Sequence, residues 1–133
     1  MGQGYLLDSN VIIGYLAGKI PVSGMDFLSN VVNSVPHISV ISKIEVLRFN
    51  DTLEKEALLE DFINISIIHS LSNNVVGQTI ELCKKSNPKI KLPDAVIAAT
   101  SLVKNFILVT RNVDDFKNIP DLVLLNPWDI PIA

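Results

Sequence analysis

The stretch KLPDAVIAAT, residues 91–100, predicts a helix that is buried on most of its surface. Pro93 suits the first turn of a helix, and the residues from Ala95 to Ala99 are all small or apolar. The helix nevertheless opens with a carboxylate, Asp94. A carboxylate at this place either favours the positive end of the helix or takes part in chemistry, and the rest of the chain decides between the two.

Apolar segments on both sides of this helix predict the strands of a sheet. They are GYLLD at 4–8, part of HISVIS at 37–42, ISIIH at 65–69, FILVT at 106–110 and, as a candidate fifth, LVLLNP at 122–127. Helical patterns lie at residues 9–18, 25–35, 42–49, 52–64, 72–86 and 92–105. Apolar strands that alternate with helices are typical of a parallel sheet covered on both faces. We therefore expect an α/β fold, a single three-layer α/β/α domain over residues 1–133 with a mostly parallel central sheet of four or five strands.

The composition of the 133 residues fits one domain with an apolar core, since 48% are hydrophobic and the formal net charge is only −3. No apolar run approaches the roughly 18 residues that a bilayer-spanning helix needs. No basic region precedes the first apolar stretch, as it would in a secretory signal. The single cysteine, Cys83, excludes an intramolecular disulfide and a cysteine-built metal site. We expect a cytoplasmic protein with no membrane partner.

Acidic side chains cluster where the predicted strands end and the helices begin. Asp8 follows the first strand directly, Glu45 lies in the first predicted turn after the second strand, and Asp94 opens the helix described above. The segment after the fourth strand carries Asn112 and Asp115. Because the carboxyl ends of parallel strands meet at one edge of the sheet, we expect these side chains to lie close together.

Each acid has a structural interpretation and a chemical one. Asp8 would cap the helix that follows it, and Ser42 with Glu45 matches the capping box S-x-x-E. Several carboxylates at one edge would, however, repel one another and raise one another's pKa. A divalent cation removes that conflict, because carboxylate oxygens are preferred ligands of Mg²⁺ and Mn²⁺. The two interpretations are compatible, and the combination of acids favours a metal site.

Four segments of the chain form a specific combination, although no one of them would suffice. They are YLLDSNVIIGYL, ISVISKIEVLRF, KLPDAVIAATSLVKNFILVTRN and VDDF, and the resemblance that they carry covers residues 4 to about 128. In this order they resemble the PIN-domain ribonucleases, and within that family the VapC-type toxins of toxin–antitoxin pairs. The resemblance implies a PIN-like fold and a metal-dependent nuclease activity.

The resemblance also assigns roles to the clustered residues. Asp8, Glu45 and Asp94 match the three core metal-binding acids of the family. The family often has a fourth acid at or near the position of Asn112, and Asp115, three residues on, is the expected substitute. An amide oxygen can bind a metal but adds no charge, so the resemblance implies one or two Mg²⁺ or Mn²⁺ ions. The positions that would support such a site are Ser9, Asn10 and Thr110.

The implied reaction is hydrolysis of an RNA phosphodiester, which needs acids and metal but no histidine. His37 and His69 are each expected to be isolated near a strand edge. Substrate cations are expected beside the acids, at Lys43, Arg48 and Arg111. Four further lysines either bind phosphate as well or are ordinary solvated side chains; they are Lys84, Lys85, Lys89 and Lys91.

Partners other than RNA also follow from the resemblance. A cognate antitoxin protein is expected, and so is a second copy of the chain in a homodimer. The main alternative is a non-catalytic PIN-like module that binds RNA or protein. Asn112, which stands where the family often has an acid, is the feature that favours this alternative.

Overall fold

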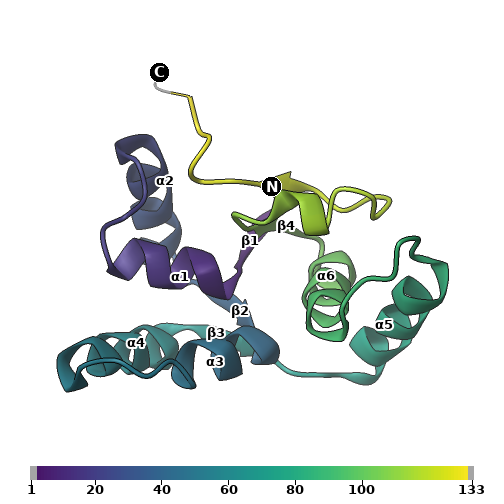
Figure 1. The fold of residues 1–133 in the computed structure, drawn as a ribbon, viewed down its shortest axis with the longest axis horizontal. Coiled ribbons are helices and arrows are strands. Elements are labelled where there is room, and N and C mark those ends of the chain that lie inside the picture. The colour runs from purple at the N-terminus through teal and green to yellow at the C-terminus, as the bar shows by residue number, and fades with distance from the viewer. Residues whose placement is uncertain (1–2, 132–133) are drawn as a thin grey trace.

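A central sheet of five parallel strands organises the protein, of which a computed structural model describes residues 3–131 (Figure 1). The strands are β1 (Gly4–Leu7), β2 (His37–Ser39), β3 (Ile67–His69), β4 (Phe106–Val109) and β5 (Leu124–Leu125). Their order across the sheet is β3-β2-β1-β4-β5, and every adjacent pair is parallel. The predicted α/β class and the parallel sheet are confirmed, and the candidate fifth strand is present.

Helices cover both faces of the sheet. They are α1 (Ser9–Leu16), α2 (Val22–Asn33), α3 (Val40–Leu47), α4 (Leu53–Ile65), α5 (Asn73–Lys85) and α6 (Leu92–Lys104), with a 3-10 turn η1 (Val113–Asp115). On one face, Leu7, Ile38 and Val109 belong to a core shared with α1 to α4. On the other face, Leu6 and Leu108 pack against α6. Alternate residues of each strand therefore face opposite layers, which is the arrangement of a three-layer fold.

Helix α6 lies in the interior, and its residues Ala95, Ala98 and Ala99 are all 0% exposed. Small side chains allow the helix to lie close to the sheet and to α5. It ends where Asn105 adopts a left-handed conformation with φ of 56°. The predicted buried helix is thus confirmed, with Asp94 in its first turn.

The start of helix α3 differs from the prediction. The helix begins at Val40, because Ser39 at the end of β2 is its N-cap and the Ser39 hydroxyl accepts a hydrogen bond from the Ile41 amide at 3.1 Å. The predicted capping box of Ser42 and Glu45 is therefore wrong, and Glu45 lies in the second turn of the helix. The β-branched residues at 40 and 41 resemble a continuing strand, which hides the true cap in the sequence.

The lengths of the helices also bear on membranes. The longest helices have 13 residues. Within residues 3–131, no helix is both long and apolar enough to cross a bilayer.

Candidate active site

Asp8 occupies the centre of the predicted acidic edge, and it caps α1 as expected. Its backbone N–H donates to the Val109 carbonyl at 3.0 Å, so the pairing of β1 with β4 continues to this point. The Asp8 residue is 5% exposed, and its carboxylate accepts hydrogen bonds from the Ser9 amide at 2.8 Å and from the Thr110 hydroxyl at 2.9 Å. Burial raises the pKa of Asp8, and these two hydrogen bonds lower it in part.

The two residues after Asp8 connect it to neighbouring elements. The Ser9 hydroxyl donates to Glu45 Oε1 at 3.2 Å, which links the start of α1 to α3. The Asn10 side chain donates to Asp8 Oδ2 at 3.5 Å and accepts from the Arg111 backbone N–H at 3.2 Å. The loop after β4 is thereby held against the start of α1.

Thr110 is the second centre of this polar network. The residue is 0% exposed, and its hydroxyl donates to Asp8 and accepts from the Asn112 backbone N–H at 3.1 Å. The structure therefore brings all three predicted supporting residues, Ser9, Asn10 and Thr110, into contact with the predicted acids.

Electrostatic interactions connect the four predicted acids. Beyond the effect of burial, the charges of Glu45 and Asp115 raise the pKa of Asp8. Asp94 is partly buried, and its pKa is raised first by that burial and then by the charges of Asp115 and Asp8. Asp115 acts on both other aspartates, so it, rather than Asn112, supplies the fourth negative charge at this edge.

The donor set fits a hard divalent cation in its chemistry. The acids offer carboxylate oxygens, and like charges in a partly buried place are stabilised when a cation joins them. In the part of the chain that the structure describes, however, no three His, Cys, Asp or Glu side chains lie close enough together to hold one ion. A set of three ligands to one ion would therefore require side-chain rotation. Hydrogen bonds orient the carboxylates of Asp8 and Glu45.

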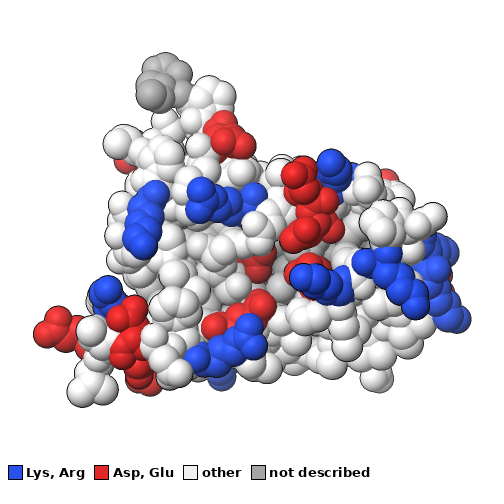
Figure 2. Space-filling model, viewed as in Figure 1, with Lys and Arg blue, Asp and Glu red and all other residues white. Residues whose placement is uncertain are grey.

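Cations border the acidic surface. Figure 2 shows Asp and Glu side chains in and around a central depression, with Lys and Arg on both sides of it. The Arg111 guanidinium lies 4.7 Å from the centre of the Trp128 ring. This contact was not predicted, because nothing in the sequence relates Trp128 to the motif that contains Arg111. Among the described residues, Lys43, Arg48 and Arg111 form no ion pair with an acid, and their role in binding substrate stays a prediction.

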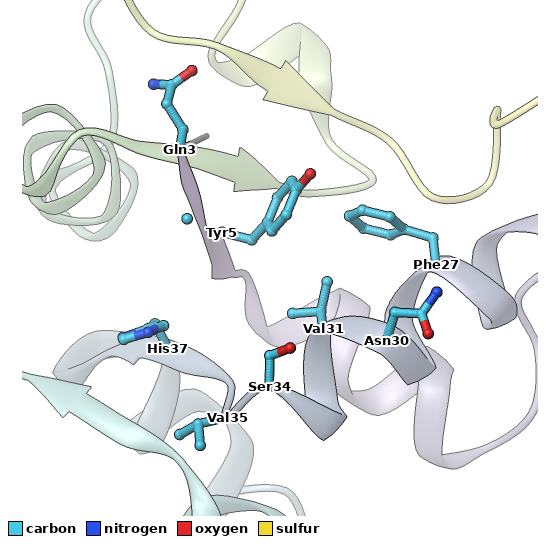
Figure 3. A pocket seen from close by; sticks show the side chains of 9 residues that line it. Gln3, Tyr5, Phe27, Asn30, Val31, Ser34, Val35 and His37 are labelled. Atoms are coloured by element: carbon cyan, nitrogen blue, oxygen red, sulfur yellow. The ribbon is translucent and has the colours of Figure 1, made fainter. Parts of the chain in front are cut away.

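The two histidines are not isolated, and that prediction was wrong. His37 Nδ1 and His69 Nε2 lie 2.9 Å apart, because β2 and β3 pair in parallel and both side chains leave the same face of the sheet. Phe106 completes a cluster of three rings, with centroids 4.9 and 5.2 Å from the two imidazoles. Burial lowers the pKa of both histidines. His37 also lines a hollow with Tyr5 at the start of β1 (Figure 3), away from the acids at the end of that strand.

The fold has counterparts among known proteins. VapBC2 from Rickettsia felis, bound to a promoter DNA fragment, is 25% identical with a TM-score of 0.75, over 92% of this chain and 97% of that one. A toxin–antitoxin complex from Klebsiella pneumoniae is 25% identical with a TM-score of 0.73, over 96% and 100%. DNA-bound VapBC from Salmonella typhimurium is 22% identical with a TM-score of 0.78, over 95% and 99%. No curated protein gives a significant match. Residues 5–122 match the PIN domain, and the chain belongs to the PIN domain family.

Proposed function

We propose that this PIN-domain protein hydrolyses RNA phosphodiester bonds with Mg²⁺ or Mn²⁺ and is the toxin of a toxin–antitoxin pair. The observation that carries the proposal is the buried carboxylate of Asp8, whose pKa is raised by burial and by the charges of Glu45 and Asp115. A helix cap needs only one short polar side chain, so capping does not explain the further acids. Buried like charges destabilise a fold, and a cation that joins them offsets that effect.

The proposed roles follow from the contacts at the site. When bound, one or two metal ions would activate a water molecule and neutralise charge on the phosphate. The proposed ligands are Asp8, Glu45, Asp94 and Asp115, with the Asn112 side-chain oxygen as a neutral addition. The Thr110 hydroxyl orients the Asp8 carboxylate, and the Ser9 hydroxyl orients that of Glu45. Outer-shell hydrogen bonds of this kind commonly set the affinity of a metal site.

An antitoxin protein is the proposed partner. The similar structures include VapBC2 from Rickettsia felis and a toxin–antitoxin complex from Klebsiella pneumoniae. On this chain, a hollow of about 370 Å³ beside α1 and α4 includes the side chains of Leu16, Phe49 and Leu58. Phe49 and Leu58 are 42% and 50% exposed. Lys19, Asp51 and Lys55 also line the hollow, and Lys55 pairs with Asp51 at 3.8 Å. An apolar antitoxin segment with an acid opposite Lys19 would suit this surface.

A homodimer is also proposed, on the resemblance to the family. Ile44 and Leu47 of α3 are 56% and 42% exposed, and they are candidates for the contact between the two copies. Sedimentation of the purified chain at micromolar concentration tests the proposal, and the mass of a monomer would contradict it.

RNA cleavage by the purified chain tests the nuclease proposal. A labelled single-stranded RNA should be cut when Mn²⁺ or Mg²⁺ is present, and EDTA should stop the reaction. Calorimetry should show one or two bound ions per chain. If neither metal supports cleavage and calorimetry shows no binding, the chain is not a metal-dependent nuclease.

A non-catalytic module that binds RNA or protein is the second candidate function. One support is Asn112, which stands where the family often has an acid. The other is that, within residues 3–131, no three His, Cys, Asp or Glu side chains lie close enough together to hold one metal ion. This candidate predicts that RNA binds equally well with and without metal and that no RNA is cut. The same experiment therefore distinguishes the two functions.

A further inference from the structure

A groove leads away from the acidic edge, between the loop after α5 and the segment after η1. Its first part has a volume of about 310 Å³ and reaches Asp94 and Asp115. Its second part has a volume of about 540 Å³. Ile90, Asn118 and Ile119 line both parts, so the two hollows adjoin and form one path along the surface.

Two lysines in the first part of the groove form no ion pair among the described residues. Lys85 forms an ion pair with Glu81 at 3.0 Å, which occupies its charge within the helix. Lys89 and Lys91 also line this part of the groove, and neither forms an ion pair with an acid among the described residues. Their charges remain available for an anion from outside the chain.

The loop that carries these lysines is tied down at both ends. The Ser86 hydroxyl accepts a hydrogen bond from the Ile90 amide at 3.1 Å. Lys91 is the N-cap of α6, and its carbonyl accepts from the Ala95 amide at 2.9 Å. Lys91 is thereby held close to Asp94, whose pKa is raised by burial and lowered by the charge of Lys91. The backbone that carries Lys91 is thus fixed near Asp94.

A chain of phosphates suits this arrangement better than a single anion does. Asp94, Asp114 and Asp115 line the first part of the groove and would repel a free anion from it. A nucleic acid strand avoids that conflict, because one phosphate can lie with a cation at the acids while its neighbour lies at Lys89 and Lys91.

The second part of the groove has a different chemistry. Leu82, Leu102 and Pro120 contribute apolar surface to it, and Gln78 adds a side-chain amide. Asp121 also lines it, which makes the hollow unfavourable for a phosphate. Apolar walls with a few hydrogen-bonding groups suit a nucleobase that is not paired in a duplex.

We propose that Lys89 and Lys91, assisted by the side-chain amides of Asn87 and Asn118, bind the RNA phosphate next to the one at the acidic edge. The strand then leaves the site through this groove, and an unpaired base enters its second part. The inference rests on the proposed nuclease function, which identifies the ligand as single-stranded RNA.

The cations that the sequence predicts beside the acids do not contribute to this path, whereas Lys89 and Lys91 come from the group for which phosphate binding is one of two interpretations. Lys43, Arg48 and Arg111 line neither part of the groove. Arg111 instead lies on the Trp128 ring. Asn118 belongs to no recognisable motif, so only the fold reveals that it faces the same hollow as the lysines.

The test measures the binding of a fluorescein-labelled single-stranded RNA in EDTA, by fluorescence anisotropy over a range of salt concentrations. The double substitution Lys89→Gln with Lys91→Gln should weaken binding by roughly tenfold and reduce the slope of log affinity against log salt by about 1. The control pair, Lys84→Gln with Lys104→Gln, removes the same charge at two exposed lysines that form no ion pair among the described residues and do not line the groove. It should change affinity and slope far less.

Calorimetry with Mn²⁺ examines the acidic edge separately, because neither groove lysine is a proposed ligand. Unweakened Mn²⁺ binding together with the selective loss of RNA affinity supports the groove. Equal losses in the two double variants, or no loss in the groove variant, overturn it and leave the nuclease proposal intact. If the groove variant alone loses RNA affinity but the wild-type chain cuts no RNA with either metal, the groove is supported and the nuclease proposal is overturned. Failure of the wild-type chain to bind RNA in EDTA overturns the groove and leaves the nuclease proposal intact, because cleavage is measured with metal.

Discussion

The two ends of strand β1 differ more in chemistry than in shape. Asp8 follows the last residue of the strand, and Asp94 and Asp115, which interact with it, line a hollow of about 310 Å³. The start of the strand lines a larger hollow of about 400 Å³, with Tyr5, Phe27 and His37 in its wall (Figure 3). Among the described residues that line this larger hollow there is no Asp, Glu, Lys or Arg. The comparison teaches that a hollow alone does not identify a functional site, whereas partly buried charge does.

Packing explains why the two ends differ. At the start of β1, Tyr5 and Phe27 meet edge to face with centroids 5.0 Å apart. Gly4 leaves room for the Phe106 ring, which would lie 2.7 Å from a Cβ at that position. At the other end, hydrogen bonds from Ser9 and Thr110 hold a carboxylate whose charge the surroundings disfavour. We therefore expect the aromatic end to serve stability and the acidic end to serve function at some expense of stability.

The largest expected effect comes from removing one charge at the acidic end. Asp94→Asn should slow metal-dependent RNA cleavage by at least about a hundredfold, since even outer-shell partners of a metal ligand contribute roughly 10–100-fold. Without metal, the variant should melt at the wild-type temperature or above it, because repulsion from Asp8 and Asp115 is relieved. Labelled RNA and thermal melting provide the measurements. Asp61→Asn, at an exposed acid of α4, is the control and should change neither.

A clear loss of metal-free thermal stability in Asp94→Asn would contradict this expectation. It would assign Asp94 to helix capping, because its carboxylate would then contribute more to α6 than it loses by repulsion.

A smaller effect is expected from the hydroxyl that orients Asp8. Thr110→Val keeps the shape of the side chain but removes the donor to Asp8 and the acceptor for the Asn112 amide. Mn²⁺ affinity and cleavage should both fall by roughly 10–100-fold. The free energy of unfolding should fall by about 1–3 kcal/mol, because buried polar groups lose their partner. Calorimetry and denaturant titration measure the two effects.

Thr79→Val is the matched control for this substitution. Thr79 is also buried, but its hydroxyl donates to the Val75 carbonyl of its own helix at 2.7 Å. Its replacement should leave Mn²⁺ affinity unchanged. Equal losses of metal affinity in the two variants would mean that the contact between Thr110 and Asp8 does not tune the site.

The two ends should also give the metal-free protein opposite dependences on pH. Burial lowers the pKa of His37 and His69, so the unfolded chain binds protons more readily than the folded chain, and stability is lost as the pH falls below about 6.5. Burial raises the pKa of Asp8 and Asp94. Their contribution to stability is therefore full below about 3.9 and is lost as the pH rises through the raised pKa values.

Melting temperatures at about pH 7.5 and about pH 5.5, on either side of the ordinary histidine pKa, test this contrast. His69→Gln should lose less stability than wild type on acidification, because a residue that binds protons more readily in the unfolded state is gone. At a third pH near the ordinary aspartate pKa of about 3.9, Asp94→Asn should lose more stability than wild type, because it cannot gain a proton in the folded state. If wild type, His69→Gln and Asp94→Asn show the same change of melting temperature with pH, the predicted opposite effects of the histidines and the aspartates are wrong.

The smallest expected effect concerns the backbone beside the hollow at the start of β1. Val35 has φ of 82°, in the left-handed region that a β-branched residue avoids. Val35→Asn should raise the free energy of unfolding by about 1 kcal/mol, because asparagine tolerates this region at lower cost. Val123→Asn is the control: both valines are 44% exposed, but Val123 is not among the residues with positive φ. An equal change in the two variants, measured in denaturant, would exclude strain as the cause.

Elements that depend on local pattern were predicted well from the sequence. The small residues of α6 indicated its burial, and the apolar runs indicated all five strands. The parallel-sheet rule also indicated that Asp8, Glu45, Asp94 and Asp115 interact. The start of α3 was mistaken because Ser39 and Ser42 are both plausible caps, and only the length of β2 decides between them.

Contacts between distant segments were the part that the sequence could not predict. The pairing of His37 with His69 joins residues 32 positions apart and depends on the register of β2 against β3. The stacking of Arg111 on Trp128 and the shared groove of Lys91 and Asn118 depend in the same way on where the C-terminal segment crosses the molecule. The register of two strands and the path of the C-terminal segment are not encoded in the hydrophobic pattern of the neighbouring residues.

By itself, the sequence determined the α/β class, the order of the elements and the residue types at the ends of the strands. Hydrophobic periodicity and capping act over a few neighbouring residues, and these features therefore lie within the range of local inference. The tertiary structure alone decided which polar groups meet Asp8, that the histidines pair, and that Lys89 and Lys91 border a groove. Those outcomes depend on side chains far apart in the chain, whose meeting is settled only when the layers pack.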